Sequence, residues 1–304
     1  MKTIIVPTDF SETAENALNY AIELAKIMEA KIIVLHVCEL PKSKKGLKSL
    51  LSIEPGERNN KALQQLDGHI RKTEPQIKFE LCVQSKMIVK NIVEISEERG
   101  AELVVFGIAE NGNFEESIVG SNTSKAISNL VTPVLMIPAK AKFRQPAKIV
   151  FAADYLELKN NRPLTALLNF VTFFNSNLFI VNVKGKDEKT SSKKIAAFIN
   201  VRKVLRKVNH TIHHTVNESV VNGINEFVRE IDAEVVAMIP HKRSFLYRLF
   251  RNSKTKKMAF YSHVPLLALP EGIEMPVFIS KSPVNIPERI FEKEIQWFND
   301  QCAI

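Results

Sequence analysis

The order of apolar segments in this chain of 304 residues occurs twice, and this repetition constrains the fold more than any other feature. Residues 148–154 restate residues 2–9, and an aspartate, Asp9 or Asp154, ends each segment. Residues 177–183 restate 31–37, 233–238 restate 101–106, and 264–270 restate 132–138. Self-similarity at a period of roughly 140 residues indicates an internal duplication. We therefore expect two similar halves, joined by a polar and basic link over residues 139–146.

Within the first half, short apolar runs typical of buried strands alternate with amphipathic helical patterns. We expect strands at residues 3–7, 31–37, 77–83, 102–106 and 134–137. Helices are expected after a cap formed by Ser11 and Thr13, over 57–74, over 86–99 with Gly100 at its end, and up to about residue 129. Strands that alternate with helices favour parallel sheets. The sequence therefore predicts an α/β fold of two tandem, doubly wound domains, each with a five-stranded parallel sheet.

We place these domains at residues 1–140 and 147–270, and residues 271–304 have no counterpart in the first half. This C-terminal extension ends in a helical pattern with one apolar side, formed by Ile290, Phe291, Ile295, Trp297 and Phe298. Such a helix either docks on the protein's own surface or binds a partner. The sequence leaves both interpretations open.

Charge is distributed unevenly between the two halves. Residues 1–142 contain 18 Lys and Arg and 18 Asp and Glu, whereas residues 143–304 contain 24 and 15, so the whole net charge of +9 lies in the second half. Such asymmetry suggests that the halves meet different partners. The three cysteines are scattered, and we see no signal peptide and no apolar run of membrane-spanning length, so we expect a cytoplasmic protein.

The stretch from Gly107 to Thr123 follows the apolar run 103–106 and ends where a new helical pattern begins. Glycine lets a backbone approach a ligand closely, and the free N–H groups of a first helical turn attract anions. Ser121, Asn122 and Thr123 either add side-chain donors to a phosphate or simply cap the helix. This stretch is therefore a candidate phosphate site.

Other candidate sites are weaker. His210, His213 and His214 lie close together, but on a strand 210 and 214 share one face while 213 points to the other, and no nearby cysteine completes a metal site. Asp9 and Asp154 have no evident partner base or nucleophile. The phosphate-loop and dinucleotide-binding glycine motifs are absent, as is the loop of a related adenylating pyrophosphatase, where Pro7, Thr8 and Asp9 stand instead. We expect no metal site and no metabolic enzyme.

The residues described above resemble the universal stress protein family. The resemblance rests on the opening Ile4–Ser11, the strand end His36–Val37, the glycine stretch and the closing segment 133–138, and it extends more weakly over the second half, to about residue 270. It implies an adenine nucleotide alpha hydrolase-like fold, with two tandem domains related by a pseudo-twofold. In the family the last strands pair across that axis, so Val134–Ile137 would lie near Leu266–Leu269.

Nucleotide-binding members of the family carry a pattern Gly-x2-Gly-x9-Gly-[Ser/Thr], and its first and third glycines match Gly107 and Gly120 here. The resemblance implies that Asp9, after Pro7 and Thr8, contacts ribose or base, and that Val37 lines the adenine pocket. It further implies that Phe106 and Gly107 floor the site. The residues that would hold the phosphates of ATP, with Mg²⁺, are Gly120, Ser121, Asn122 and Thr123.

Glu110 stands where the pattern has its second glycine, and Gly112 lies two residues on. Two like charges about 4 Å apart cost on the order of 4 kcal/mol near a protein surface, so this carboxylate weakens ATP binding unless it turns to solvent or helps to hold Mg²⁺. In the second half the positions equivalent to Gly107, Glu110 and Gly120 are Ile239, Lys242 and Asn252, without a glycine between them.

The second half instead carries a basic segment, residues 242–257, which contains no acidic residue and is interleaved with Phe245, Leu246, Tyr247, Leu249 and Phe250. This segment is either a solvated basic face or a surface that binds an acidic partner, such as nucleic acid, acidic lipid or an acidic protein. Two functions follow. One is a stress-response regulator or scaffold, and no enzyme, that binds ATP in its first half. The other is a scaffold without nucleotide that acts through the basic second half, and either form is an intrachain pseudo-dimer open to further assembly.

Overall fold

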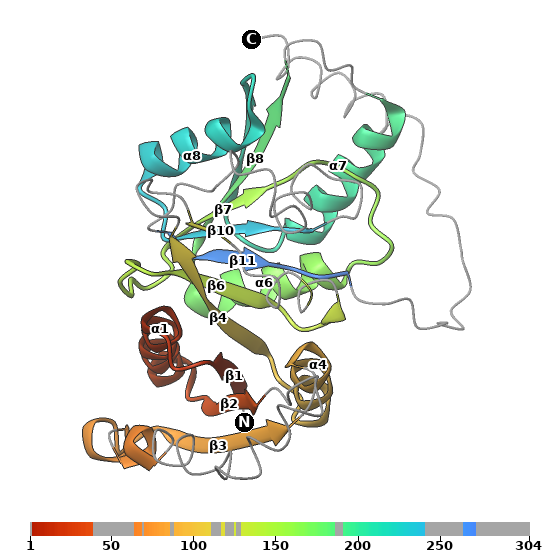
Figure 1. The fold of residues 1–304 in the computed structure, drawn as a ribbon. Helices are drawn as coiled ribbons and strands as arrows, with labels where there is room; N and C mark the ends of the chain where they lie inside the picture. The colour runs from red at the N-terminus through yellow and green to blue at the C-terminus, as the bar shows by residue number, and fades with distance from the viewer. Residues whose placement is uncertain are drawn as a thin grey trace, which may run out of the picture. The chain divides into compact units, whose positions relative to one another are not determined.

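The structure is a computed structural model that describes residues 2–38, 64–68, 70–85, 88–110, 117–118, 125, 129–185, 191–240 and 264–271. The chain divides into two compact units, Met1–Phe143 (unit 1) and Arg144–Ile304 (unit 2) (Figure 1). Gly120–Thr123, the basic segment 242–257 and residues 272–304 of the C-terminal extension lie outside the described residues. The pairing of the last strands across a pseudo-twofold stays a prediction.

Among the described residues of unit 1, five parallel strands lie in the order β3-β2-β1-β4-β6. The strands are β1 (Thr3–Thr8), β2 (Lys31–Cys38), β3 (Lys78–Ser85), β4 (Leu103–Glu110) and β6 (Val134–Pro138). The helices are α1 (Glu12–Met28) and α4 (Ile88–Glu98), and residues 64–68 and 70–73 are also helical. β1, β2, β4 and β6 contribute fully buried side chains to the core, among them Ile4, Val104 and Leu135.

Helix α1 begins where the sequence predicts it. Ser11 has an extended backbone, and its side chain accepts a hydrogen bond from the N–H of Ala14, which satisfies one of the free donors of the first turn. Glu12 and Glu15 in that turn complement the positive end of the helix dipole. The face formed by Ala14, Ala17, Leu18, Ala21, Leu24 and Ala25 is buried, so packing as well as capping holds α1 in place.

The glycine stretch differs from the prediction. We expected the fourth strand to end at residue 106, but β4 runs through Gly107 to Glu110. A short strand, β5 (Ser117–Ile118), returns antiparallel along it and pairs Ile118 with Ala109. The strand continues because Gly107 and Ile108 pair with Ile137 and Pro138 of β6. Gly107 is therefore a strand residue, not the start of a loop.

Among the described residues of unit 2, five parallel strands lie in the order β9-β8-β7-β10-β11. The strands are β7 (Lys148–Ala152), β8 (Asn177–Lys184), β9 (His210–Val216), β10 (Val235–Met238) and β11 (Leu266–Ala268), and the helices are α6 (Arg162–Phe174), α7 (Ser192–Leu205) and α8 (Val220–Ile231). If only the five parallel strands of each unit are numbered, in chain order, both sheets have the order 3-2-1-4-5. The predicted α/β fold with parallel sheets is confirmed.

Candidate functional site

The candidate site lies at the carboxyl end of β1. From β1 the chain builds the sheet outward in both directions, because β2 pairs on one side and β4 on the other. In open α/β sheets, ligands bind in the crevice at such a reversal of strand order, beyond the carboxyl ends of the strands. Pro7 and Thr8 are the last residues of β1, and Asp9 follows directly. Three of the predicted contact residues therefore stand at the expected crevice.

The strands bring further predicted residues to this end of the sheet. Thr8 pairs with His36, so Val37 is the next residue along β2, and it is half-buried. Ile5 of β1 pairs with Val104 of β4, and continuing this register sets Phe106 and Gly107 alongside Pro7 and Thr8. Phe106 is buried.

Asp9 is held by a small hydrogen-bond network. Its Oδ1 atom accepts from the backbone N–H of Ser11 at 3.0 Å and from the Ser11 hydroxyl at 2.6 Å, and that hydroxyl is 2.9 Å from the hydroxyl of Thr13. Partial burial acts to raise the pKa of Asp9, but the hydrogen bonds from Ser11 outweigh it, and the pKa lies below the ordinary value of 3.8. The carboxylate is therefore ionised at neutral pH.

The chemistry of this carboxylate fits the predicted contact with ribose. Both bonds from Ser11 end on Oδ1, and Asp9 is exposed, so Oδ2 can accept hydrogen bonds from the hydroxyl groups of a sugar. A charged acceptor makes such bonds stronger than neutral pairs. The fixed orientation of the side chain reduces the entropy lost when a ligand binds.

Gly107 has a structural role at the same place. A Cβ built on this residue would lie 2.2 Å from the carbonyl oxygen of Thr13 and 3.0 Å from the N atom of Ala14. The absent side chain thus lets the first turn of α1 approach β4 closely. Gly107 positions the helix that carries Ser11 and Thr13, whatever else it contacts.

Two aromatic residues at this site were not among the predicted contacts. The Phe10 ring lies 4.7 Å from the His36 ring between centroids, at an interplanar angle of 42°. His36 Nδ1 is 2.9 Å from the carbonyl oxygen of Thr8 and donates to it, since a carbonyl can only accept. The signal in the sequence was the position of both residues at strand ends, because parallel strands bring such residues together.

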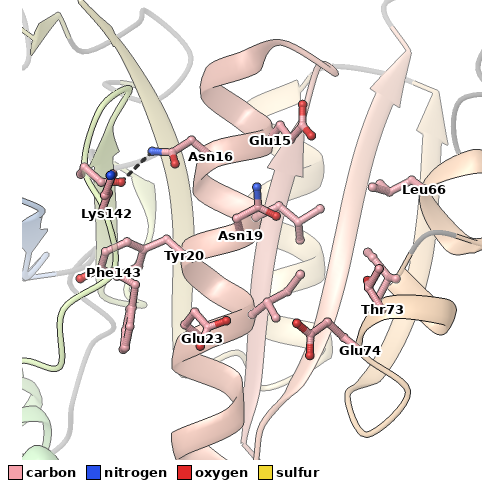
Figure 2. A pocket seen from close by; sticks show the side chains of 14 residues that line it. Glu15, Asn16, Asn19, Tyr20, Glu23, Leu66, Thr73, Glu74, Lys142 and Phe143 are labelled. Carbon is pink, nitrogen blue, oxygen red and sulfur yellow. Dashed lines mark hydrogen bonds between the residues drawn. The ribbon is translucent and has the colours of Figure 1, made fainter.

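A groove of about 420 Å³ lies elsewhere in unit 1, along α1. Figure 2 shows Glu15, Asn19 and Glu23 of α1 facing it, with Leu66, Thr73 and Glu74 on one side and Lys142 and Phe143 on the other. None of the six predicted contact residues that the structure describes lines this groove. Asn16 at its edge donates to the carbonyl oxygens of Pro138 at 2.9 Å and Ala141 at 3.1 Å, which ties residues 138–141 to the helix.

The equivalent strand end in unit 2 is built differently. Asp154 Oδ1 accepts from the N–H of Leu156 at 3.2 Å, but Leu156 replaces Ser11 and so supplies no hydroxyl. Asn182, in the place of His36, donates to the carbonyl oxygen of Ala153 at 2.7 Å. Tyr155, in the place of Phe10, is only 3% exposed, and its ring packs edge-on against Phe198 at 5.1 Å.

The three histidines of β9 do not form one cluster. The His213 ring lies 4.7 Å from Phe227 of α8, whereas the His214 ring lies about 6 Å from Tyr155 and from Phe198 of α7, on the other face of the strand. Burial lowers the pKa of both rings, that of His214 to about 4. The part of the chain that the structure describes holds no group of three or more His, Cys, Asp or Glu side chains placed to bind a metal.

Comparison with known proteins adds the family. The model of the universal stress protein family matches residues 1–138. The universal stress protein MJ0577 of Methanocaldococcus jannaschii is 29% identical over 157 residues, which cover 46% of this chain and 96% of that protein. The universal stress protein MJ0531 of the same organism is 26% identical over 145 residues, which cover 46% of this chain and 84% of that protein.

A solved structure extends the likeness of fold to both units. The crystal structure of a universal stress protein from Archaeoglobus fulgidus matches 89% of this chain and 98% of its own, with a TM-score of 0.66 at 20% sequence identity. Across the described residues, no helix combines the length and apolar character needed to span a bilayer. The chain therefore carries, in residues 1–138, a domain of the universal stress protein family.

Proposed function

We propose that this protein binds an adenine nucleotide, ATP with Mg²⁺, at the carboxyl end of β1 in unit 1, and that binding controls its action as a cytoplasmic stress-response regulator or scaffold. The observation that carries the proposal is the place of Asp9. An ionised, pre-oriented carboxylate stands at the reversal of strand order, in the half that matches the family. Asp9 would accept the ribose hydroxyls, and the bound metal ion would neutralise phosphate charge.

The rest of the site follows from the resemblance. Val37 would line the pocket of the adenine base, and Phe106 and Gly107 would form its floor. The segment Gly120–Thr123 would hold the phosphates. Among the described residues, the Asp9 carboxylate accepts hydrogen bonds from Ser11, the N-cap of α1, and a capping residue does not support an enzymatic role. Any hydrolysis would therefore be slow and incidental.

The first test is to denature freshly purified protein and analyse the supernatant for released nucleotide. The second is calorimetric titration with ATP and Mg²⁺ of the wild type and of Gly120→Val, where the added side chain would block the phosphates. Gly185→Val is a matched control, because no atom lies within 4 Å of a Cβ at that residue. Heat that is the same for wild type and Gly120→Val, or absent from both, would contradict nucleotide binding at this site.

The charge asymmetry favours a second function, a scaffold whose basic second half binds an acidic partner. Residues 143–304 contain 24 basic and 15 acidic residues, and the resulting positive charge attracts such partners. Retention on heparin should then fall when Lys254, Lys256 and Lys257 are changed to Glu. The matched control reverses Lys203, Arg206 and Lys207. Retention that survives the first reversal would exclude the basic segment as the contact.

A further inference from the structure

Phe10 is an exposed large hydrophobic residue at the proposed nucleotide site, and its exposure needs an explanation. It is 37% exposed, although it is a large apolar residue and its ring contacts the buried His36 of β2. Burying a phenylalanine ring typically contributes about 1.5–3 kcal/mol, so an exposed ring forgoes much of that stabilisation. The exposure of a ring at a ligand-binding crevice is explained if the bound ligand covers the ring.

The backbone at Phe10 does not by itself explain this exposure. Phe10 has a φ of 63°, in the left-handed region that costs an L-residue roughly 1–2 kcal/mol. Tyr155, at the equivalent place in unit 2, has a φ of 49°. Since both units contain the left-handed turn, the turn belongs to the fold. The difference between the units is the ring itself, which is 3% exposed at Tyr155.

In unit 1 the neighbour of this ring is the imidazole of His36. His36 is buried, and its Nδ1–H bond to the carbonyl oxygen of Thr8 fixes the plane of the imidazole. The Phe10 ring packs against this imidazole, with 4.7 Å between the ring centroids and an interplanar angle of 42°. In unit 2 the same carbonyl bond is made by Asn182, which offers no ring, and Tyr155 turns instead onto Phe198.

We propose that the exposed Phe10 ring, supported by His36, is the surface on which the aromatic base of the nucleotide stacks. The inference rests on the proposed function and adds to it the residue that recognises the base. A flat apolar ring attracts any nucleobase, because every base has a π-face. Val37 follows His36 directly in β2, so the backbone of the residue that the family resemblance assigns to the adenine pocket adjoins the imidazole against which Phe10 packs.

The test separates the base from the phosphates. Full-length wild type and Phe10→Ala are titrated by calorimetry with ATP and, separately, with inorganic tripolyphosphate, both with Mg²⁺. Loss of one stacking contact should weaken ATP binding about tenfold, within the range measured for base stacking on aromatic residues. Tripolyphosphate, which has no base, should bind both proteins equally, and Phe10→Tyr should restore ATP binding because it keeps the ring.

Two controls keep the result interpretable. Phe173→Ala removes a ring that is 39% exposed on α6 and should leave ATP binding unchanged. Phe10→Asn tolerates the left-handed backbone without a ring and should behave as Phe10→Ala does. If the wild type binds ATP and Phe10→Ala binds it equally well, or if both ligands weaken together, base stacking on Phe10 is overturned while nucleotide binding stands. A wild type that binds no ATP overturns both proposals.

Discussion

The backbone of α1 fills the space in which a side chain at residue 107 would lie, and this limits the substitutions that Gly107 tolerates. A methyl group in Gly107→Ala would meet the carbonyl oxygen of Thr13 at 2.2 Å, and a backbone atom in a capped helix turn cannot move aside cheaply. Overpacking of this kind costs about 1–3 kcal/mol. Urea unfolding should therefore show a clear loss of stability for Gly107→Ala.

Gly68→Ala is the control for this prediction. Gly68 lies in a helical stretch, and no atom stands within 4 Å of its Cβ position. Alanine is favoured over glycine in a helix by about 1 kcal/mol, so this variant should be as stable as the wild type or more so. Equal unfolding midpoints for the wild type and Gly107→Ala would contradict the close approach of α1 to β4.

His214 makes the stability of unit 2 sensitive to acid. Burial, and then the charges of Lys184 and His213, lower its pKa to about 4 from an ordinary value of 6.5. The unfolded chain therefore binds this proton more readily, and the contribution of the neutral ring to stability is lost as the pH falls from 6.5 towards 4. Because the side chain is only partly buried, we expect a loss of about 1 to 2 kcal/mol rather than the full shift.

The measurement compares wild type with His214→Val by urea unfolding at pH 7 and pH 5. Valine is a reasonable replacement, because Val83 pairs with His36 in unit 1 as His214 pairs with Asn182 in unit 2. Stability should fall less between the two pH values in the variant than in the wild type. Thr215→Val, on the same strand, should keep the wild-type dependence. Parallel curves for wild type and His214→Val would rule out His214 as the source of the acid sensitivity.

Among the contacts between elements, the Asn16 side chain joins helix α1 to the segment that follows strand β6. Its Nδ2 atom donates to the carbonyl oxygens of Pro138, which also accepts from the N–H of Ala141 at 3.0 Å, and of Ala141. Asn16→Ala removes this donor from both carbonyls, while Pro138 keeps its bond from Ala141, and the loss of a hydrogen bond typically costs about 1 kcal/mol. The expected result is a loss of stability together with faster proteolysis near residue 141.

Asn19→Ala is the matched control, one turn further along α1. Asn19 is exposed at the groove shown in Figure 2, so its loss should change stability by less than about 0.5 kcal/mol. Equal proteolysis rates for the two variants would show that the bonds of Asn16 do not hold residues 138–141.

The elements that the sequence predicted well are the ones with the clearest physical signal. Continuous apolar runs marked β1, β2 and β6 to within one residue, because strands buried on both faces need such runs. The end of β4 was wrong, since Gly107 was interpreted as the start of a loop. The feature that makes glycine necessary there is the nearby turn of α1, which is a tertiary contact and leaves no trace in local sequence.

In the candidate site, too, the features that follow local rules could be predicted, and those that depend on tertiary contacts could not. Asp9 and the capping role of Ser11 could be predicted, because strand ends and helix caps follow local rules. The pairing of Phe10 with His36 could not, since it depends on the register between β1 and β2 and on a left-handed residue that is not glycine. The contrast between Phe10 and Tyr155 likewise depends on how each ring packs.

In the whole molecule, the two units have the same strand order but different residues at the carboxyl end of their first strand. A nucleotide should therefore bind to only one of the two units. Asp9 is held by Ser11 and borders an exposed ring, whereas unit 2 has Leu156 in place of Ser11 and a buried Tyr155. A ligand stabilises what it binds, and amide hydrogen exchange slows where local opening is suppressed. With saturating ATP and Mg²⁺, exchange should slow in peptides covering residues 3–14 and 31–38. Peptides covering the equivalent residues 148–159 and 177–184 should change little and serve as an internal control. Equal slowing in both sets would mean that the second strand end also binds the nucleotide, against the closed packing of Tyr155 on Phe198.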